Sequence, residues 1–412
     1  MKKILWAALL AMLLLSGCGA EVPEATELTL PQLVEVQVDY EEPVVELPYA
    51  NVELVMQSMW LREDPLSRVL LEAAALFEKQ TGAVVTIRWY DENVAMETAE
   101  DIDIFQIGAE DFGTLNAEYI LNLTEMAAAA DYEAKSHETL RQWIEQQCGY
   151  LGAVAQVPYL GGIYYNADIF AQCGIEVLPQ DWDGFLNLCH TLRQKGCQPL
   201  TLDQEDALAA MELHLRRSVG TDEVRRMMSK GHRWDTNMPA INAMDQVKLF
   251  VQDGNVAVGA PAETPTGQNK MALSNSAMMV GTNADCADVE ETTLMDLNWG
   301  MFPYPGNLSS GTWMTADLLV IHRDSEHAQA AFDFMMLLVS GEFDQLHADI
   351  SCGIPADPHN ESPISGAMDA ITASQPEPLG LMGQKQMTAA VRLWSAWYEK
   401  AGRYASLLEI SK

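Results

Sequence analysis

The chain has 412 residues, with 24 basic and 59 acidic side chains and a formal net charge of −35 at pH 7. Proteins bind phosphate backbones through clustered lysine and arginine, so this balance excludes nucleic acid as the natural partner. Hydrophobic residues make up 48% of the chain. That is enough for a large core, which we expect to be divided between two lobes.

The first residues have the form of a targeting signal. A basic start precedes an apolar run from Ile4 to Leu15, which is shorter than the roughly 20 residues of a membrane-spanning helix. The run ends in Leu-Ser-Gly-Cys and resembles the lipobox of bacterial lipoprotein signal peptides. This resemblance implies cleavage of residues 1–17 and a lipid on Cys18, which would hold the protein at the outer face of the bacterial cell membrane. An ordinary signal peptide with a coincidental cysteine is the alternative.

Residues 18–50 are predicted to form a tether. Between Ala20 and Ala50 there are eight acidic residues, four prolines and no basic residue. This composition disfavours both helix and central strand, and such a tether spans on the order of 30 Å. The alternation over residues 34–38 leaves an edge strand as the alternative.

Six cysteines follow Cys18, an even number that permits disulfides outside the cell without requiring them. The chain has no C-x-x-C pair, and its histidine spacing does not suit a metal, so we expect neither a metal site nor a cofactor. Cys189 is predicted to face a helix core and Cys197 to lie just past the end of that helix. A bridge between these two is therefore not expected.

The folded part is predicted to begin with a strand, a helix and a second strand. Residues 52–60 alternate as a strand, Asp64 is the predicted N-cap before Pro65, and apolar residues then recur at helical spacing up to Gly82. A strand over 83–89 follows, which implies a parallel sheet. A third strand over 102–107 runs into a turn over 108–111, at the sheet edge where ligands of open α/β sheets bind.

The later elements continue the alternation of helix and strand. Asp181 is the predicted cap of a helix that ends at Lys195-Gly196, and Ser325 is the predicted cap of a helix up to Leu338. Residues 318–321 are predicted to form a buried strand. The carboxyl-terminal segment, 385–408, is predicted to be helical.

Several segments together resemble a known family. They are, in chain order, Leu76–Gly82, Asp103–Phe105, Leu121–Thr124, Val157–Tyr159, Tyr165–Phe170 with Gly174-Ile175, and Asp181–Phe185. This order is similar to that of the extracellular solute-binding proteins of carbohydrate ABC importers, relatives of maltose-binding protein. The resemblance covers about residues 51–412. Residues 271–278 depart from the family's usual pattern, and the loop after Gly281 lacks the tryptophan that many sugar binders place there.

The resemblance implies a two-lobe α/β fold of the periplasmic-binding-protein type, each lobe a mainly parallel sheet with flanking helices and the ligand cleft between them. The expected amino-terminal lobe comprises residues 51–155 and 316–356. The carboxyl-terminal lobe comprises residues 156–315 and 357–412. The crossings are expected near residues 155–158, 313–317 and 354–358. The protein would act as a monomer that passes a sugar to ABC transporter permease subunits.

A sugar site needs aromatic rings that stack on C–H faces and polar groups that bind hydroxyls. On the amino-terminal side, Trp60 follows the first strand and Glu110 and Asp111 follow the third. Each has a simpler explanation, a core tryptophan or a solvated turn. Tyr159 lies just past the first crossing, where glycines 161 and 162 would let a ligand approach the backbone. Hinge packing is the alternative for that ring.

The carboxyl-terminal side offers a second set of candidates. Asn283 and Asp285 follow a strand and could bridge two hydroxyls, or form only a polar loop. Trp313 at the second crossing is the preferred stacking platform because its neighbours are small and polar. Trp234 lies in a polar loop, where contact with a ligand and helix-end packing explain it equally well.

Two other functions compete with sugar binding. A secreted glycosidase would need a pair of carboxylates at a fixed separation, and the chain has no nucleophile elbow, zinc-protease motif or phosphate loop. We therefore expect no enzyme activity. A polyamine binder on the same fold is the other alternative, because acidic and aromatic residues also make a cation site.

Overall fold

The computed structural model describes residues 47–90, 95–99, 101–202, 213–227, 238–258, 276–294, 296–374 and 376–378. The predicted signal peptide with Cys18, the possible edge strand at 34–38, Trp234 and the predicted carboxyl-terminal helix lie outside the described residues. The described residues fall in one unit by their internal contacts.

Ten strands in the described residues form one sheet, in the order β2-β1-β3-β9-β4-β7-β5-β6, with β10 beside β9 and β8 beside β4. Their bounds are β1 Glu53–Gln57, β2 Val84–Arg88, β3 Ile104–Gly108, β4 Val154–Asn166, β5 Gln198–Leu202, β6 Val256–Val258, β7 Ser276–Thr282, β8 Trp299–Phe302, β9 Trp313–Ile321 and β10 Glu377–Pro378. The strands β1, β2 and β3 are parallel, as the sequence predicts, while β9 is antiparallel to both β3 and β4.

The described helices lie between these strands, in several places two or three in succession. The α-helices are α1 Ser67–Thr81, α2 Ala109–Phe112, α3 Thr124–Ala129, α4 Glu138–Cys148, α5 Ala167–Cys173, α6 Trp182–Gln194, α8 Thr221–Met227, α9 Met238–Gln252, α11 Asn283–Thr293, α12 Ala328–Leu338, α13 Gly341–Ile350 and α14 Ala367–Ser374. The short 3-10 helices are η1 Met96–Thr98, η2 Ala117–Tyr119 and η3 Tyr132–Lys135.

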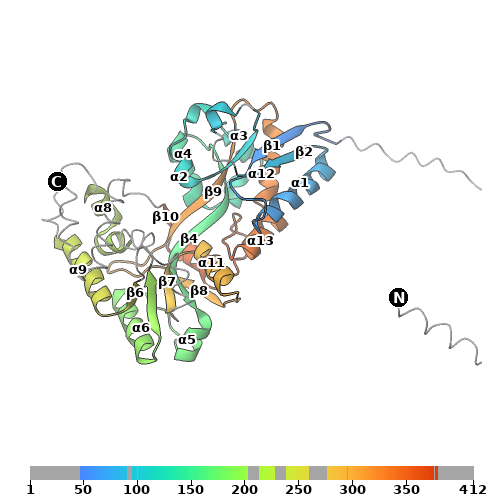
Figure 1. Ribbon diagram of the computed structural model, residues 1–412. Coiled ribbons are helices and arrows are strands. Elements are labelled where there is room, and N and C mark those ends of the chain that lie inside the picture. The colour runs from blue at the N-terminus through green and yellow to red at the C-terminus, as the bar shows by residue number, and fades with distance from the viewer. Residues whose placement is uncertain are drawn as a thin grey trace, which may run out of the picture. The chain divides into compact units, whose positions relative to one another are not determined.

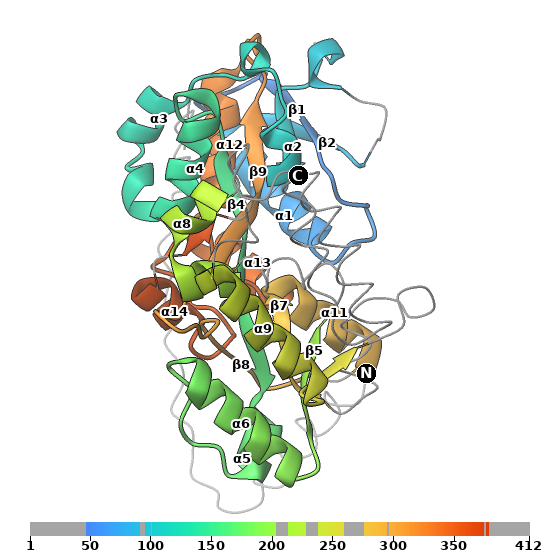
Figure 2. The same ribbon diagram turned by 90° about the vertical axis from the view of Figure 1, so that its left-hand side faces the viewer.

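The two long strands β4 and β9 connect two groups of elements (Figure 1). One group contains β1–β3, α1–α4 and α12, and the other contains β5–β8, α5, α6 and α9 (Figures 1 and 2). The first part of β4 pairs with β9, and its second part pairs with β7 and β8. The predicted crossings near residues 155–158 and 313–317 therefore coincide with one antiparallel ladder.

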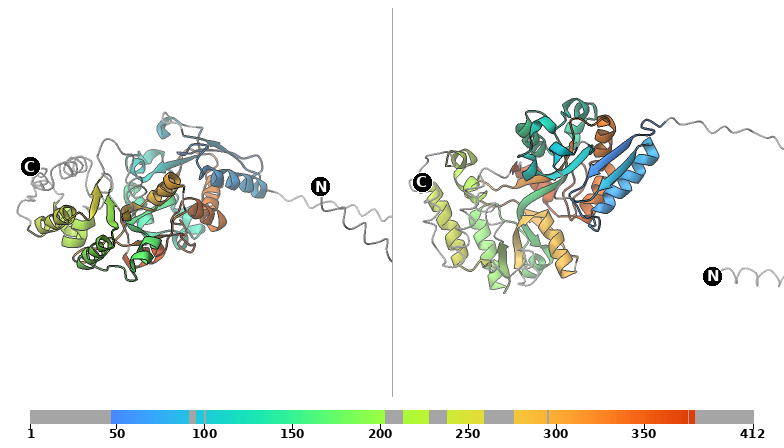
Figure 3. Two further views of the ribbon diagram at one scale, coloured as in Figure 1. Left: turned by 60° about the horizontal axis from the view of Figure 1, so that its bottom comes forward. Right: turned by 45° about the horizontal axis from the view of Figure 1, so that its top comes forward.

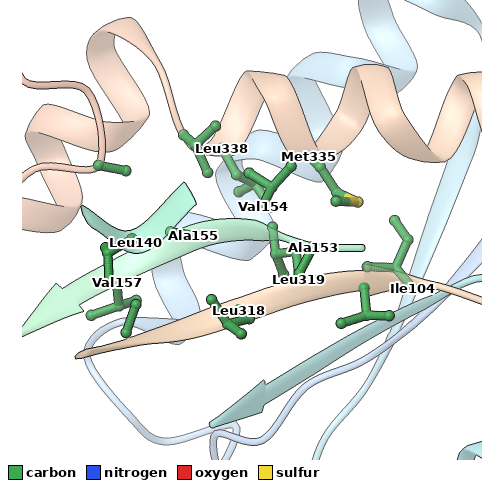
Figure 4. Close-up of a cluster of buried hydrophobic side chains, with 14 of the residues drawn as sticks. Ile104, Leu140, Ala153, Val154, Ala155, Val157, Leu318, Leu319, Met335 and Leu338 are labelled. Carbon is green, nitrogen blue, oxygen red and sulfur yellow. The ribbon is translucent and has the colours of Figure 1, made fainter. Parts of the chain in front are cut away.

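The buried hydrophobic side chains form two clusters. The first core cluster gathers β1, β3, β9, α1, α12 and the start of β4, and Figure 4 shows part of it, with Ile104, Val154, Leu319 and Met335 facing one another. The second core cluster gathers α5, α6, α9, β5 and part of β7, with Trp313 from β9. Met279, Trp299 and Met301 belong to the first cluster although they follow the crossing, so the first cluster extends into the second group of elements.

The ends of α6 and α1 agree with the sequence prediction. The Asp181 side chain accepts a hydrogen bond from the Gly184 N–H, which satisfies one free donor at the start of α6. Gly82 follows α1 with φ 82° and donates its N–H to the Glu78 carbonyl, a conformation that glycine adopts without strain.

Two predicted helix caps are wrong. The helix α1 begins at Ser67, after a turn in which Asp64 accepts a bond from the Leu66 N–H, so Asp64 caps that turn instead of the helix. The helix α12 begins at Ala328, and its N-cap His327 makes no side-chain cap. The Ser325 hydroxyl instead donates to Asp103 at 2.5 Å, which fastens this loop to the start of β3.

Candidate ligand-binding site

Two of the predicted ligand residues meet at the β4–β9 ladder. The Tyr159 hydroxyl donates to Asp317 Oδ2 at 2.8 Å, and the Trp60 indole lies near enough to the same carboxylate to lower its pKa. Tyr159 pairs with Thr315 and Val157 pairs with Asp317, so Tyr159 and Asp317 are diagonal neighbours on one face of the ladder. Trp60 reaches them from the segment just after β1. We call Trp60, Tyr159 and Asp317 the aromatic–carboxylate cluster.

The carboxylate of this cluster is almost completely buried. Asp317 is 6% exposed, and burial raises its pKa to about 6, while the hydrogen bond from Tyr159 and the nearby Trp60 indole act to lower it. Burial also raises the pKa of Tyr159, and the charges of Asp317, Asp64 and Asp288 act in the same direction. The phenol therefore stays protonated and serves as a donor at neutral pH.

The charges of two acidic side chains besides Asp317 act on Tyr159. Asp64 lies in the turn after β1, and Asp288 lies exposed on α11. Burial, followed by the charges of Asp285 and Glu291, raises the pKa of Asp288. These carboxylates can accept hydrogen bonds from ligand hydroxyls.

A buried polar network lies beside the cluster, at the carboxyl ends of β1 and β3. The Ser58 hydroxyl donates to Gln106 Oε1 at 2.7 Å, and Gln106 Nε2 donates to Gln156 Oε1 at 2.9 Å. Gln156 is the extra residue of a β-bulge in β4, between the pairs that Ala155 and Val157 make with β9. The bulge turns this side chain toward β3, which is the usual local effect of such an insertion.

Trp60 is 7% exposed and belongs to the first core cluster, which agrees with the alternative of a core tryptophan, and its ring has a histidine as a neighbour. The rings of Trp60 and His347 are stacked, with centroids 6.1 Å apart and an interplanar angle of 16°. His347 is 2% exposed, and neither ring nitrogen has a hydrogen-bond partner among the described residues. Burial lowers the pKa of His347 to about 4, so the imidazole is neutral at physiological pH.

The predicted residues on α11 are engaged within the fold. Asn283 is 1% exposed; its Oδ1 accepts from the Leu160 N–H at 2.7 Å, and its Nδ2 donates to the Pro158 carbonyl at 3.5 Å. Asp285 accepts from the Thr282 N–H at 2.6 Å and completes a capping box. The segment expected as a loop is thus the first turn of a helix, and Asn283 holds the backbone on both sides of Tyr159.

Trp313, the preferred stacking platform, is 1% exposed and belongs to the second core cluster. Its indole covers Gly161, where an added Cβ would lie 1.7 Å from Trp313 Cε2. The space above Gly162 is filled by the methyl group of Met301. The expectation that these glycines leave room for a ligand is wrong, because core side chains occupy that room.

The remaining predicted residues are more scattered. Glu110 and Asp111 lie in the short helix α2 instead of a turn, and Asp111 is exposed. Sequence reasoning missed Asp317 as a site residue, although an aspartate within the apolar strand Trp313–Ile321 is a usable signal, because a buried charge needs partners. No sequence pattern indicates that His347 would stack on Trp60.

Within the described residues, no helix is both long and apolar enough to cross a bilayer. In the same part of the chain, no group of three or more His, Cys, Asp or Glu side chains is arranged to hold a metal ion.

Comparison with known proteins places the chain in a family. Residues 63–342 match the family model of bacterial extracellular solute-binding proteins. No curated protein sequence matches the chain.

Solved structures show the same fold. A probable secreted solute-binding lipoprotein from Streptomyces coelicolor superposes with a TM-score of 0.70 at 13% identity, over 87% of this chain and 97% of the other. The apo form of RafE from Streptococcus pneumoniae superposes with a TM-score of 0.68 at 16% identity, over 88% of this chain and 97% of the other. A Bacillus licheniformis sugar transporter in complex with stachyose superposes with a TM-score of 0.62 at 16% identity, over 87% of this chain and 98% of the other. The fold is thus the two-lobe α/β fold of these binding proteins, and this chain belongs to the bacterial extracellular solute-binding protein family.

Proposed function

We propose that this protein captures a carbohydrate outside the cell, between its two lobes, and delivers it to the permease of an ABC transporter. The observation that carries the proposal is the aromatic–carboxylate cluster. It brings Trp60 and Tyr159 together from different strands, at the ladder that connects the two groups of elements. The structures of similar fold include proteins solved with stachyose and with raffinose.

The cluster suits a neutral sugar in two respects. The partly exposed ring of Tyr159 offers apolar surface for the C–H face of a pyranose, with the 7% exposed Trp60 beside it, and Asp64 and Asp288 offer acceptors for hydroxyls. Asp317 acts as a positioning residue, because its carboxylate binds Tyr159 and lies beside Trp60. Glu110, Asp111, Asn283, Asp285, Trp313 and Trp234 remain further candidates for ligand contacts.

The proposal includes the attachment of the protein. Cys18 carries the lipid, residues 18–50 form the tether, and the lobes comprise residues 51–155 with 316–356 and residues 156–315 with 357–412. The protein binds its ligand as a monomer and without turnover. Cys18→Ala should move the protein from the detergent phase to the aqueous phase after expression in a bacterium, and equal partition of both forms would contradict the lipid site.

The binding test is thermal unfolding of the purified protein with raffinose, stachyose, maltose, chitin oligosaccharides and, for comparison, spermidine. A ligand at 100 times its Kd adds about 2.7 kcal/mol of apparent stability. Stabilisation by a sugar that barely changes with salt supports the proposal. If only spermidine stabilises the protein, and its effect weakens as salt is added, the protein is a cation binder and the sugar proposal is wrong.

The site is tested on the sugar that binds. Tyr159→Ala and Trp60→Ala should each weaken binding at least tenfold, which is about 1.4 kcal/mol. Tyr119→Ala is the control, because Tyr119 contacts His322 beyond the end of β9. If the control and the two site variants bind equally well, the site lies elsewhere.

A further inference from the structure

Two cysteine thiols meet at the ends of neighbouring helices. Cys173 is the last residue of α5, and Cys197 lies between α6 and β5; their sulfur atoms are 3.5 Å apart. The helices α5 and α6 lie side by side, as Figures 1 and 2 and the left view of Figure 3 show. Of the six cysteines in the described residues, these two form the only pair for which a sulfur–sulfur contact is found.

The backbone holds both thiols in place. After Cys173, Gly174 has φ 72° and closes α5, and the Ile175 N–H donates to the Phe170 carbonyl at 2.9 Å. Before Cys197, Gly196 has φ 83°, and the Cys197 N–H donates to the Leu192 carbonyl at 3.0 Å. The contact therefore joins two hydrogen-bonded helix ends, and a disulfide would require the sulfur–sulfur distance to shorten from 3.5 Å to about 2.05 Å.

The surroundings of the pair differ from those of Cys189. Cys189 faces the second core cluster from within α6 and is 0% exposed. Cys173 is 6% exposed and Cys197 is only partly buried, so an oxidant can reach the pair through Cys197. Burial raises the pKa of Cys173, as does its hydrogen bond to Cys197, while the charge of Lys195 opposes this shift.

We propose that Cys173 and Cys197 form a disulfide in the mature protein. The family is extracellular, and disulfides persist in that environment. The oxidant is a disulfide, either of a small thiol or of a thiol–disulfide oxidoreductase of the cell envelope. The Cys197 thiolate attacks one oxidant sulfur, the oxidant's S–S bond breaks, and one thiol leaves. Cys173 then attacks Cys197 Sγ and releases the second thiol. The pair loses two electrons and two protons, which reduce the oxidant to two thiols.

The disulfide would enclose α6 in a loop that closes within the second group of elements. In the chain-entropy model a loop of this size stabilises the folded state. We therefore expect dithiothreitol to lower the Tm of the wild-type protein by several degrees. Sugar affinity should change little, because the pair does not contact the aromatic–carboxylate cluster.

The test uses the full chain exported into the oxidising envelope of a bacterial host. The protein is denatured without reductant, treated with N-ethylmaleimide, digested and mapped by mass spectrometry. Cleavage after Glu176 separates Cys173 from Cys189, and trypsin cleavage at Arg193 and Lys195 separates Cys189 from Cys197. We expect a peptide pair linked through Cys173 and Cys197, two hydrogens lighter than the sum of its parts, with Cys189 alkylated.

The variants complete the test. In Cys197→Ser, Cys173 should become alkylated and dithiothreitol should no longer lower the Tm, and Cys173→Ser should give the reciprocal result. Cys148→Ser is the control and should keep both the Cys173–Cys197 disulfide and the fall in Tm with dithiothreitol. The proposal is overturned if both thiols are alkylated in the unreduced protein even after incubation with oxidised glutathione, or if either is linked to a different cysteine.

Discussion

The two sets of predicted ligand residues have different roles in the fold. Tyr159 donates a hydrogen bond to Asp317 and is partly exposed, while Trp60, which lies beside the same carboxylate, is 7% exposed and stacks on His347. Asn283 and Trp313 are both 1% exposed; one holds the β4 backbone and the other fills the space above Gly161. Both sets contact β4 or belong to it. In the first set the partly exposed ring of Tyr159 can face a ligand, and the second set fixes the strand that carries Tyr159.

The comparison shows what a polar or aromatic residue after a strand can mean. Asn283 supplies a partner for the Leu160 N–H, and a buried donor without a partner is costly. The same residue type in an exposed loop would be free to bind hydroxyls. Substitutions in each set can show whether ligand contact and support of the strand are separate roles.

The largest expected effect is the loss of stability when the buried Trp313 is replaced. Trp313→Ala removes a fully buried indole, which typically costs about 3–5 kcal/mol of unfolding free energy. Denaturant unfolding measures this loss. If the variant is as stable as the wild type and loses only sugar binding, then Trp313 is a ligand platform and the distinction between the two sets fails.

The second prediction concerns the pH dependence that Asp317 contributes. Its pKa is raised from 3.8 to about 6 in the folded state, a difference of about 3 kcal/mol at 1.36 kcal/mol per unit. The folded state therefore binds the proton more tightly. The contribution of Asp317 to stability is fully present below pH 4 and is lost as the pH rises through 6.

Asp317→Asn removes this dependence. The unfolding free energy of the variant minus that of the wild type should rise by about 2.5 kcal/mol between pH 4 and pH 7. Asp349→Asn, at an exposed position on α13, is the control and should show no such rise. A flat difference for Asp317→Asn would mean that its carboxylate is not buried in solution.

The third prediction concerns the support of Tyr159. Asn283→Ala leaves the Leu160 N–H without its partner and should cost about 1–3 kcal/mol of unfolding free energy. Its effect on sugar affinity should be smaller than that of Tyr159→Ala, because the ring remains. Asp288→Asn, exposed on the same helix, is the control for stability. Loss of affinity with unchanged stability would make Asn283 a direct ligand contact.

The smallest expected effect is that of Tyr159→Phe. The variant keeps the ring and loses one hydrogen bond, at a cost of about 0.5–1.5 kcal/mol. That bond lowers the pKa of Asp317, so the loss of stability with rising pH should shift to higher pH. Tyr150→Phe removes a phenol bonded to the carbonyls of Ala117 and Ile120 and should leave the profile unchanged. An identical profile for Tyr159→Phe would argue against the bond.

Much of the fold could be predicted because its signals are local. The alternation before Trp60, the glycine at position 82 and the cap at Asp181 each depend on a few neighbouring residues. The failures involve partners that are distant in the sequence. The Ser325 hydroxyl donates a hydrogen bond to Asp103 instead of capping α12. The Asp64 carboxylate accepts a hydrogen bond within the turn before α1 instead of capping that helix. Local patterns do not show these competitors.

The candidate site was predicted less completely, for a related reason. Trp60 and Tyr159 are predicted from their places after a strand and a crossing, and their contact with a ligand stays a prediction. Asp317 was missed because its importance comes from partners on other segments. Gln156 was missed because the register shift in the β4–β9 ladder is a property of the strand pair. Such features depend on how strands pair.

The position of β9 also determines when folding can be completed. This strand lies between β3 and β4 in the sheet and is bonded to both, yet it is made long after either of them. A chain emerging from the ribosome therefore has no central strand until Ile321 has been synthesised. Pairing between segments so distant in sequence is slow. The delay leaves a newly made chain without its central strand for most of its synthesis.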